Sequence, residues 1–231
     1  MLRARGKWHA LACLMFVTVA MFITVAHGDE SFVRLMLDGR HVRWSAQPAH
    51  APLTLTYAFA TEDVQSGTIG RCGRLVAPAE LMASSGLKPD DFVVATSRAF
   101  QSWESVANIE FRWTADPASA QIVIGAQAEP LGVAFANLTL AAEVHSGDHI
   151  ITSAAICLNP DRLWKVRPGG SAGAFDLEYV LAHEIGHTLG LDHPSARGHL
   201  MSFKYIEQRS VLSQGDAQGA MALYGARPVR N

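Results

Sequence analysis

Residues 183–193 read HEIGHTLGLDH, and this stretch decides how the chain is interpreted. Side chains four positions apart lie on one face of a helix, so His183 and His187 can bind the same metal ion. Glu184 lies one step further round the helix and can reach a water molecule bound to that ion. Catalytic zinc sites have three protein ligands plus water, and zinc takes imidazole nitrogen well. The stretch therefore predicts one catalytic zinc ion.

The third ligand requires the chain to turn back after the helix. Gly190 can make that turn because glycine adopts positive φ without a Cβ clash, and His193 then approaches from the far side. Three neutral histidines leave the ion its full charge, which lowers the pKa of bound water. Glu184 can take the water proton and deliver it to a leaving amine. The alternative, an amphipathic helix with surface histidines, does not account for Gly190 and His193.

Apolar periodicity places the remaining elements around this stretch. Alternation and short apolar runs predict strands at 53–59, 109–113, 121–126, 131–138 and 153–158. Helices are expected to begin at Pro89, to follow an N-cap at Asp176 and to span 214–224. Segments 29–50, 61–88, 141–150 and 159–173 are expected to be a lead-in, a connection, a loop and an irregular link. This order favours one α+β domain.

The first 28 residues have the layout of a secretory signal. Arg3, Arg5 and Lys7 precede an apolar run over 10–26, and small residues stand before Asp29. An uncleaved membrane anchor is the alternative. Cleavage predicts a protein that is secreted or periplasmic, without stable membrane insertion. It also changes the formal charge from −2 to −5, because three basic and no acidic residues are lost, so a nucleic-acid partner is not expected.

Three cysteines occur in the sequence, and Cys13 lies within the expected signal. Cys72 and Cys157 remain in the exported chain, where two cysteines most simply form a disulfide. Two buried free thiols are the alternative.

A second motif follows the zinc-binding stretch at a fixed distance. Met201 stands eight residues after His193 within HLMSFKY (199–205), and Tyr205 follows four residues later. The eleven-residue stretch resembles the zinc motif of the metzincins, and the spacing to Met201 resembles the Met-turn of their matrixin branch. Segments 99–103 and 212–225 are also similar to matrixins, so the resemblance covers about residues 50–226.

The resemblance implies a single zincin-type domain. Its expected fold is a twisted, mostly parallel five-stranded sheet with three helices, and the active-site helix lies below a cleft. The expected domains are a signal at 1–28, a lead-in at 29–50, a catalytic domain at 51–226 and a tail at 227–231.

The resemblance also implies how a substrate binds. A protein or peptide would lie antiparallel to an edge strand near 132–137, and Ala134 and Tyr205 would contact it. Met201 would form a hydrophobic floor beneath the ligands without binding metal. The protein is expected to be a monomer.

Other matrixin features are not conserved in this sequence. The ligand patterns of their second zinc and of their calcium ions are absent, so neither Ca²⁺ nor a second Zn²⁺ is supported. His145, Asp148 and His149 can be interpreted as a metal site or as a solvated polar loop, and the loop is favoured. The sequence Arg71-Cys72-Gly73 resembles part of the matrixin cysteine switch but follows the first strand, so a disulfide is favoured over latency by Cys72.

The predicted function is an exported zinc endopeptidase with Glu184 as general base. The alternatives are a secreted zinc-binding interaction module without proteolytic activity and a membrane-anchored form of the same protease. A pure binding module has no need of a base beside its zinc, which favours the peptidase.

Overall fold

A computed structural model describes residues 31–45, 51–65, 71–145, 147–166, 172–195, 197–206 and 212–228. The expected signal at 1–28 lies outside the described residues, as does part of the expected tail. Among the residues described, no helix combines the length and apolar character needed to cross a bilayer.

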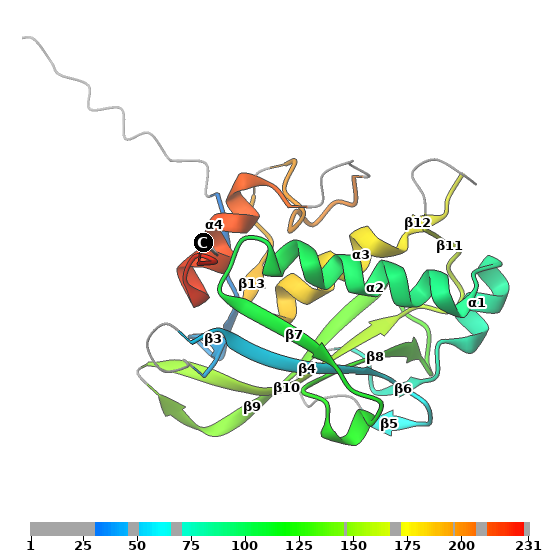
Figure 1. Cartoon of the computed structure of the whole chain (residues 1–231), viewed down its shortest axis with the longest axis horizontal. Coiled ribbons are helices and arrows are strands. Elements are labelled where there is room, and N and C mark those ends of the chain that lie inside the picture. The colour runs from blue at the N-terminus through cyan, green and yellow to red at the C-terminus, as the bar shows by residue number, and fades with distance from the viewer. Residues whose placement is uncertain are drawn as a thin grey trace, which may run out of the picture.

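The centre of the domain is a twisted and mostly parallel sheet (Figure 1). β4 (Leu53–Phe59) lies between β7 (Ile109–Trp113) and β8 (Ile122–Gln127), and β8 pairs in parallel with β10 (Asp148–Leu158). β9 (Ala134–His145) is the antiparallel neighbour of β10. Every residue of β8 is buried, as its apolar composition predicts for a central strand. The α+β class and the mostly parallel sheet are therefore confirmed.

The sheet is larger than the five strands expected. Four short strands extend it to nine among the described residues: β2 (Met36–Leu37), β3 (Arg40–Trp44), β5 (Val64–Gln65) and β6 (Arg74–Val76). These strands lie in the segments expected to be a lead-in (29–50) and a connection (61–88), where no strand was predicted. Three of these strands have only two or three residues, which is too short to show a period. Pairing stabilises them: β3 pairs with β10 and β6 with β8, while β2 pairs with β3 and β5 with β6.

The expected loop at 141–150 was also wrong. β9 and β10 continue through it as a long antiparallel hairpin, with Asp148 paired to His145. Polar residues are compatible with strands here because this end of the hairpin is only partly buried. The predicted strand at 131–138 begins three residues later than expected, because Gly132 adopts φ 61° before it.

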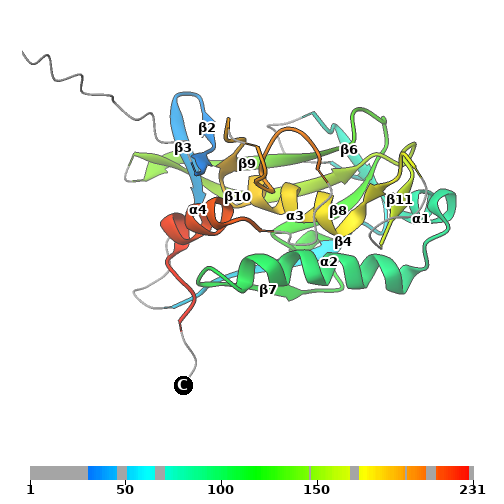
Figure 2. The same cartoon turned by 90° about the horizontal axis from the view of Figure 1, so that it is seen from above.

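Four α-helices are described rather than the expected three, because α1 (Ala79–Ser85) lies in the segment expected to be a connection. α2 (Pro89–Glu104) and α3 (Leu177–Thr188) cover one face of the sheet (Figure 2). The Trp103 indole N–H of α2 donates to the Ala182 carbonyl of α3 at 2.9 Å. α4 (Gln214–Tyr224) lies beside the end of α3, where the Tyr224 hydroxyl donates to the Leu189 carbonyl.

A smaller core lies on the opposite face of the sheet, away from α3. It contains Cys72 and Cys157, which are joined in a disulfide with their Cα atoms 6.3 Å apart. Asn137 of β9 holds the same segment, because its side-chain carbonyl accepts from the Cys72 N–H at 3.3 Å. The disulfide engages Cys72 and keeps its sulfur away from the histidines of α3.

Candidate metal centre

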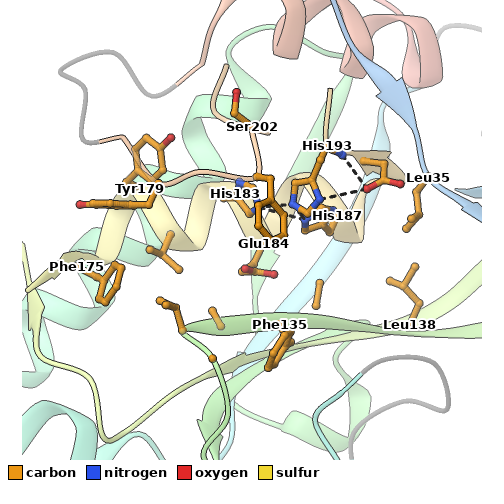
Figure 3. A pocket seen from close by; sticks show the side chains of 18 of the residues that line it. Leu35, Phe135, Leu138, Phe175, Tyr179, His183, Glu184, His187, His193 and Ser202 are labelled. Atoms are coloured by element: carbon orange, nitrogen blue, oxygen red, sulfur yellow. Dashed lines mark hydrogen bonds and ion pairs between the residues drawn. The ribbon is translucent and has the colours of Figure 1, made fainter. Parts of the chain in front are cut away.

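α3 brings the two histidines of the HExxH pattern to one point. Asp176 caps the helix by accepting from the Tyr179 N–H at 2.9 Å, and Gly190 ends it with φ 93°. These local signals place the helix as predicted. His183 and His187 lie one turn apart on its cleft side (Figure 3).

The structure brings His193 to the same point. The three Nε2 atoms are separated by 3.2 Å (His183–His187), 3.2 Å (His183–His193) and 3.1 Å (His187–His193). Tetrahedral zinc with bonds of about 2.0–2.1 Å would separate its nitrogen ligands by about 3.3–3.4 Å. The residues therefore fit zinc. Within the described part of the chain, no other three histidine, cysteine, aspartate or glutamate side chains bring their ligand atoms this close together.

The second ring nitrogen of two histidines fixes the imidazole orientation. The Nδ1–H of His183 donates to the Leu200 carbonyl at 2.7 Å, and that of His187 donates to the Leu191 carbonyl at 2.8 Å. This tautomer leaves each Nε2 lone pair directed at the shared point. His193 is held more loosely, with Nδ1 3.5 Å from the Asp192 carboxylate.

The electrostatics of the site favour neutral histidines. Burial lowers the pKa of His183 to about 4 and the pKa of His187 well below its ordinary value. Burial also lowers the pKa of His193. Neutral imidazole is the form that binds metal, so these shifts prepare the ligands at neutral pH.

Glu184 lies in the cleft between α3 and β9 (Figure 3). It is 6% exposed, and burial raises its pKa to about 8. A hydrogen bond from the backbone N–H of Ala136 opposes part of this shift. The carboxylate is thus positioned by the strand that borders the cleft.

Met201 packs against α3 at Gly186. It is buried, and a Cβ added to Gly186 would clash with its sulfur, so glycine at 186 permits this close packing. Asp216 holds the Met201 turn from below, because its buried carboxylate accepts from the N–H groups of Leu200 (2.8 Å) and Met201 (3.1 Å).

The importance of Asp216 was missed from the sequence. It is the fourth residue of a capping box begun by Ser213, whose N–H donates to the carboxylate at 2.8 Å. The Ser-x-x-Asp spacing could have located the cap, but not its contact with residues 200 and 201.

A cavity of about 440 Å³ extends along the cleft in front of the histidines. Ala134 and Tyr205, the two predicted substrate contacts, both line it. The Tyr205 hydroxyl accepts from the Asp176 N–H at 3.0 Å, and its ring packs edge-on against Phe175 and Tyr179.

The sequence also did not reveal the lining residues of the N-terminal segment. Leu35 and Leu37 come from the segment expected to be a lead-in. The dipeptide Asp38-Gly39, with φ values of 48° and 74°, is a hairpin-turn signal that could have revealed this segment.

Among the described side chains, His145, Asp148 and His149 are not found as a ligand cluster. Asp148 pairs with Arg34 at 2.9 Å and lies 3.9 Å from Arg43. His149 is in β10 opposite Val42, and the side chain of His145 lies outside the described residues. The expected polar loop is therefore a paired strand end.

Comparison with known proteins locates this site in a matched region. Residues 80–225 match the family described as Matrixin. The chain is 30% identical over 196 residues to Metalloendoproteinase 4-MMP of Arabidopsis thaliana, covering 80% of the chain and 49% of that protein. It is 32% identical over 154 residues to Metalloendoproteinase 1 of Glycine max, covering 60% of the chain and 47% of that protein. A shorter match, 40% over 72 residues, is to Stromelysin-2 of Rattus norvegicus, covering 29% and 14%. The chain spans about half the length, or less, of these relatives.

Proposed function

Because this chain belongs to the matrixin family, we propose that it is an exported zinc endopeptidase with Glu184 as general base. The observation that carries the proposal is the meeting of three Nε2 atoms 3.1–3.2 Å apart beside a buried carboxylate, in a cleft bordered by an edge strand. A metal site of purely structural use has no need of such a carboxylate or of an open cavity.

His183, His187 and His193 would hold the zinc through Nε2. A bound zinc ion supplies a Lewis acid that lowers the pKa of a water molecule and polarises the scissile carbonyl. The carbonyls of Leu200 and Leu191 keep two of the imidazoles in the ligating tautomer. Met201 and Gly186 form the packed floor that keeps α3 and the following turn in register.

Glu184 would take a proton from the attacking water and deliver it to the amine that leaves. The Ala136 N–H restrains the carboxylate, so the base has a fixed position. Burial raises its pKa to about 8 despite the Ala136 hydrogen bond, and the opposite charge of a cation at the histidines would favour the ionised form. These opposing effects suit a base that works near neutral pH.

The substrate would be an extended peptide that adds to the edge of β9, antiparallel to it. Ala134 would contact its backbone. The side chain that follows the scissile bond would enter the apolar part of the cavity formed by Phe175, Tyr179 and Tyr205. Strand addition supplies affinity through backbone hydrogen bonds, and the cavity supplies selectivity.

The test is to purify the protein, measure bound zinc and assay cleavage of a denatured protein with and without a chelator. We expect about one zinc per chain, and we expect the chelator to abolish cleavage. Glu184→Gln should lower kcat by about 10²- to 10⁴-fold while zinc stays bound. Glu178→Gln is the matched control, because it lies on the same helix outside the cavity and pairs with Arg98.

Two outcomes would select the alternatives. Zinc binding without cleavage of varied substrates would support a secreted zinc-binding interaction module. Mass spectrometry of the exported protein tests the proposed signal at 1–28: an N-terminus at or near Asp29 supports a secreted or periplasmic protein, and an intact N-terminus supports the anchored form.

A further inference from the structure

The segment 31–44 lies directly against the chain that carries the third histidine. β1 (Val33–Arg34) pairs antiparallel with β13 (Leu191–Asp192), with Val33 opposite Asp192. The segment then turns at Asp38-Gly39 and returns as β3, which pairs with β10. All of it precedes residue 80, where the Matrixin match begins.

Leu35 and Leu37 direct their side chains into the cleft. Both line the cavity in front of the histidines, whereas Met36 between them does not line it and is 53% exposed. Alternation along an extended chain accounts for this arrangement, since residues 35 and 37 share one face. Leu138 of β9 also lines the cavity and lies on the same side of the histidines as Leu35 (Figure 3), so leucine side chains form this wall. The carboxylate of Asp192 lines the cavity as well.

This wall is fixed to the metal centre by backbone and side-chain bonds. The Leu35 N–H donates to the Gly190 carbonyl at 2.8 Å, and the Val42 N–H donates to the Leu35 carbonyl at 3.1 Å. The Trp44 indole N–H donates to the Thr188 carbonyl at 2.8 Å. A Cβ at Gly190 would clash with the Val42 carbonyl, so the segment and the His193 turn are packed backbone to backbone.

The direction of β9 identifies which part of a substrate meets this wall. In Figure 3, Leu35 and Leu138 lie on one side of the histidines, and Phe175 and Tyr179 lie on the other. β9 runs from Ala134 to Leu138 and beyond. A peptide antiparallel to β9 would therefore place its N-terminal part beside Leu138 and its C-terminal part beside Ala134.

We propose that Leu35 and Leu37, with Leu138, form an apolar subsite that selects a substrate side chain on the N-terminal side of the scissile bond. The proposal rests on the proposed peptidase function and goes beyond it by assigning a specificity role to residues 31–44. The occupant would be an aliphatic or aromatic side chain, because the subsite offers it three leucine side chains.

The experiment compares cleavage of a peptide library by the wild-type protein, Leu37→Lys and Met36→Lys. We expect the wild type to favour apolar residues at one position before the scissile bond. Leu37→Lys should lower kcat/KM for those peptides about tenfold, mainly through KM, and should raise it for peptides with an acidic residue there. Met36→Lys introduces the same charge one residue away on the outer face and should keep the wild-type profile.

Preference after the scissile bond is the internal reference, because Phe175, Tyr179 and Tyr205 would set it and none is altered. Leu35→Ala is the second variant, checked for folding by thermal denaturation, and should weaken the same preference without creating the acidic one. An active Leu37→Lys protein with the wild-type profile would overturn the subsite while leaving the peptidase proposal standing. Wild-type protein that cleaves no peptide would overturn both.

Discussion

Replacing Glu184 by glutamine should stabilise the metal-free protein at neutral pH. The carboxyl group is buried, and its pKa rises from the ordinary 4.5 to about 8 on folding. Since the folded pKa is raised, the contribution to stability is complete below pH 4.5 and is lost as pH rises through 8. Glutamine occupies nearly the same volume without an ionisable group, so the variant avoids this loss.

The size of the effect follows from the pKa values. Each pH unit between 4.5 and 8 changes the free energy of unfolding by about 1.4 kcal/mol for one proton. Between pH 5 and pH 7.5 the advantage of Glu184→Gln should therefore grow by about 3 kcal/mol, a large part of the 5–15 kcal/mol typical of a domain. The histidine titrations occur in both proteins, so they cancel in the difference.

The assay is chemical denaturation of chelator-treated protein at several pH values, comparing wild type with Glu184→Gln. Glu80→Gln, an exposed glutamate of α1, is the control for replacing a carboxylate and should follow the wild type. Parallel pH profiles for wild type and Glu184→Gln would refute the reasoning, since they would mean that Glu184 ionises equally easily in both states.

Three further variants test the parts that support the site. The double variant Cys72→Ser/Cys157→Ser removes a disulfide between residues 85 positions apart, so the free energy of unfolding should fall by about 4 kcal/mol in denaturant titrations. The zinc content should stay the same, and a gain of proteolytic activity would instead favour latency through Cys72. Asp216→Asn replaces a buried carboxylate that accepts from three backbone N–H groups, so the free energy of unfolding should fall by about 1–3 kcal/mol in thermal unfolding. Zinc should also be lost more readily during dialysis, and unchanged zinc retention would show that Asp216 does not support the metal centre. Gly186→Ala forces a methyl group against the sulfur of Met201 and should lower the free energy of unfolding by about 1–3 kcal/mol in the same measurement. A variant as stable as the wild type would show that this packing is loose.

Local signals explain which parts of the fold could be predicted from the sequence. The helix carrying His183 and His187 begins at a capping aspartate and ends at a glycine with positive φ, and both devices act within a few residues. β4 and β7 have the predicted bounds because their alternation is regular. The spacing of the three histidines and Glu184 is likewise a local pattern, and the structure places these side chains together.

The parts that could not be predicted depend on contacts distant in sequence. Leu35 lines the cleft because its backbone N–H is hydrogen-bonded to the carbonyl of Gly190, more than 150 residues away in the sequence. No local sequence pattern around Leu35 predicts that contact. The strand ends at 141–150 have polar composition and become strands by pairing with each other. Asp216 was located only as a residue in a helix, and its contacts to residues 200 and 201 arise from packing.

The pKa shifts at the metal centre all have the same physical sense. Burial raises the pKa of Glu184 and lowers that of His183, His187 and His193, so every group is driven toward its uncharged form. A dication reverses this balance for the carboxylate and is accepted by the neutral imidazoles without prior loss of a proton. Zinc binding should consequently raise the free energy of unfolding in two ways: through its bonds to the three histidines, and by offsetting the unfavourable burial of the Glu184 charge. Burial of Glu184 in low-polarity surroundings therefore destabilises the metal-free protein at neutral pH. The same surroundings would help Glu184 to accept and donate a proton once zinc is bound.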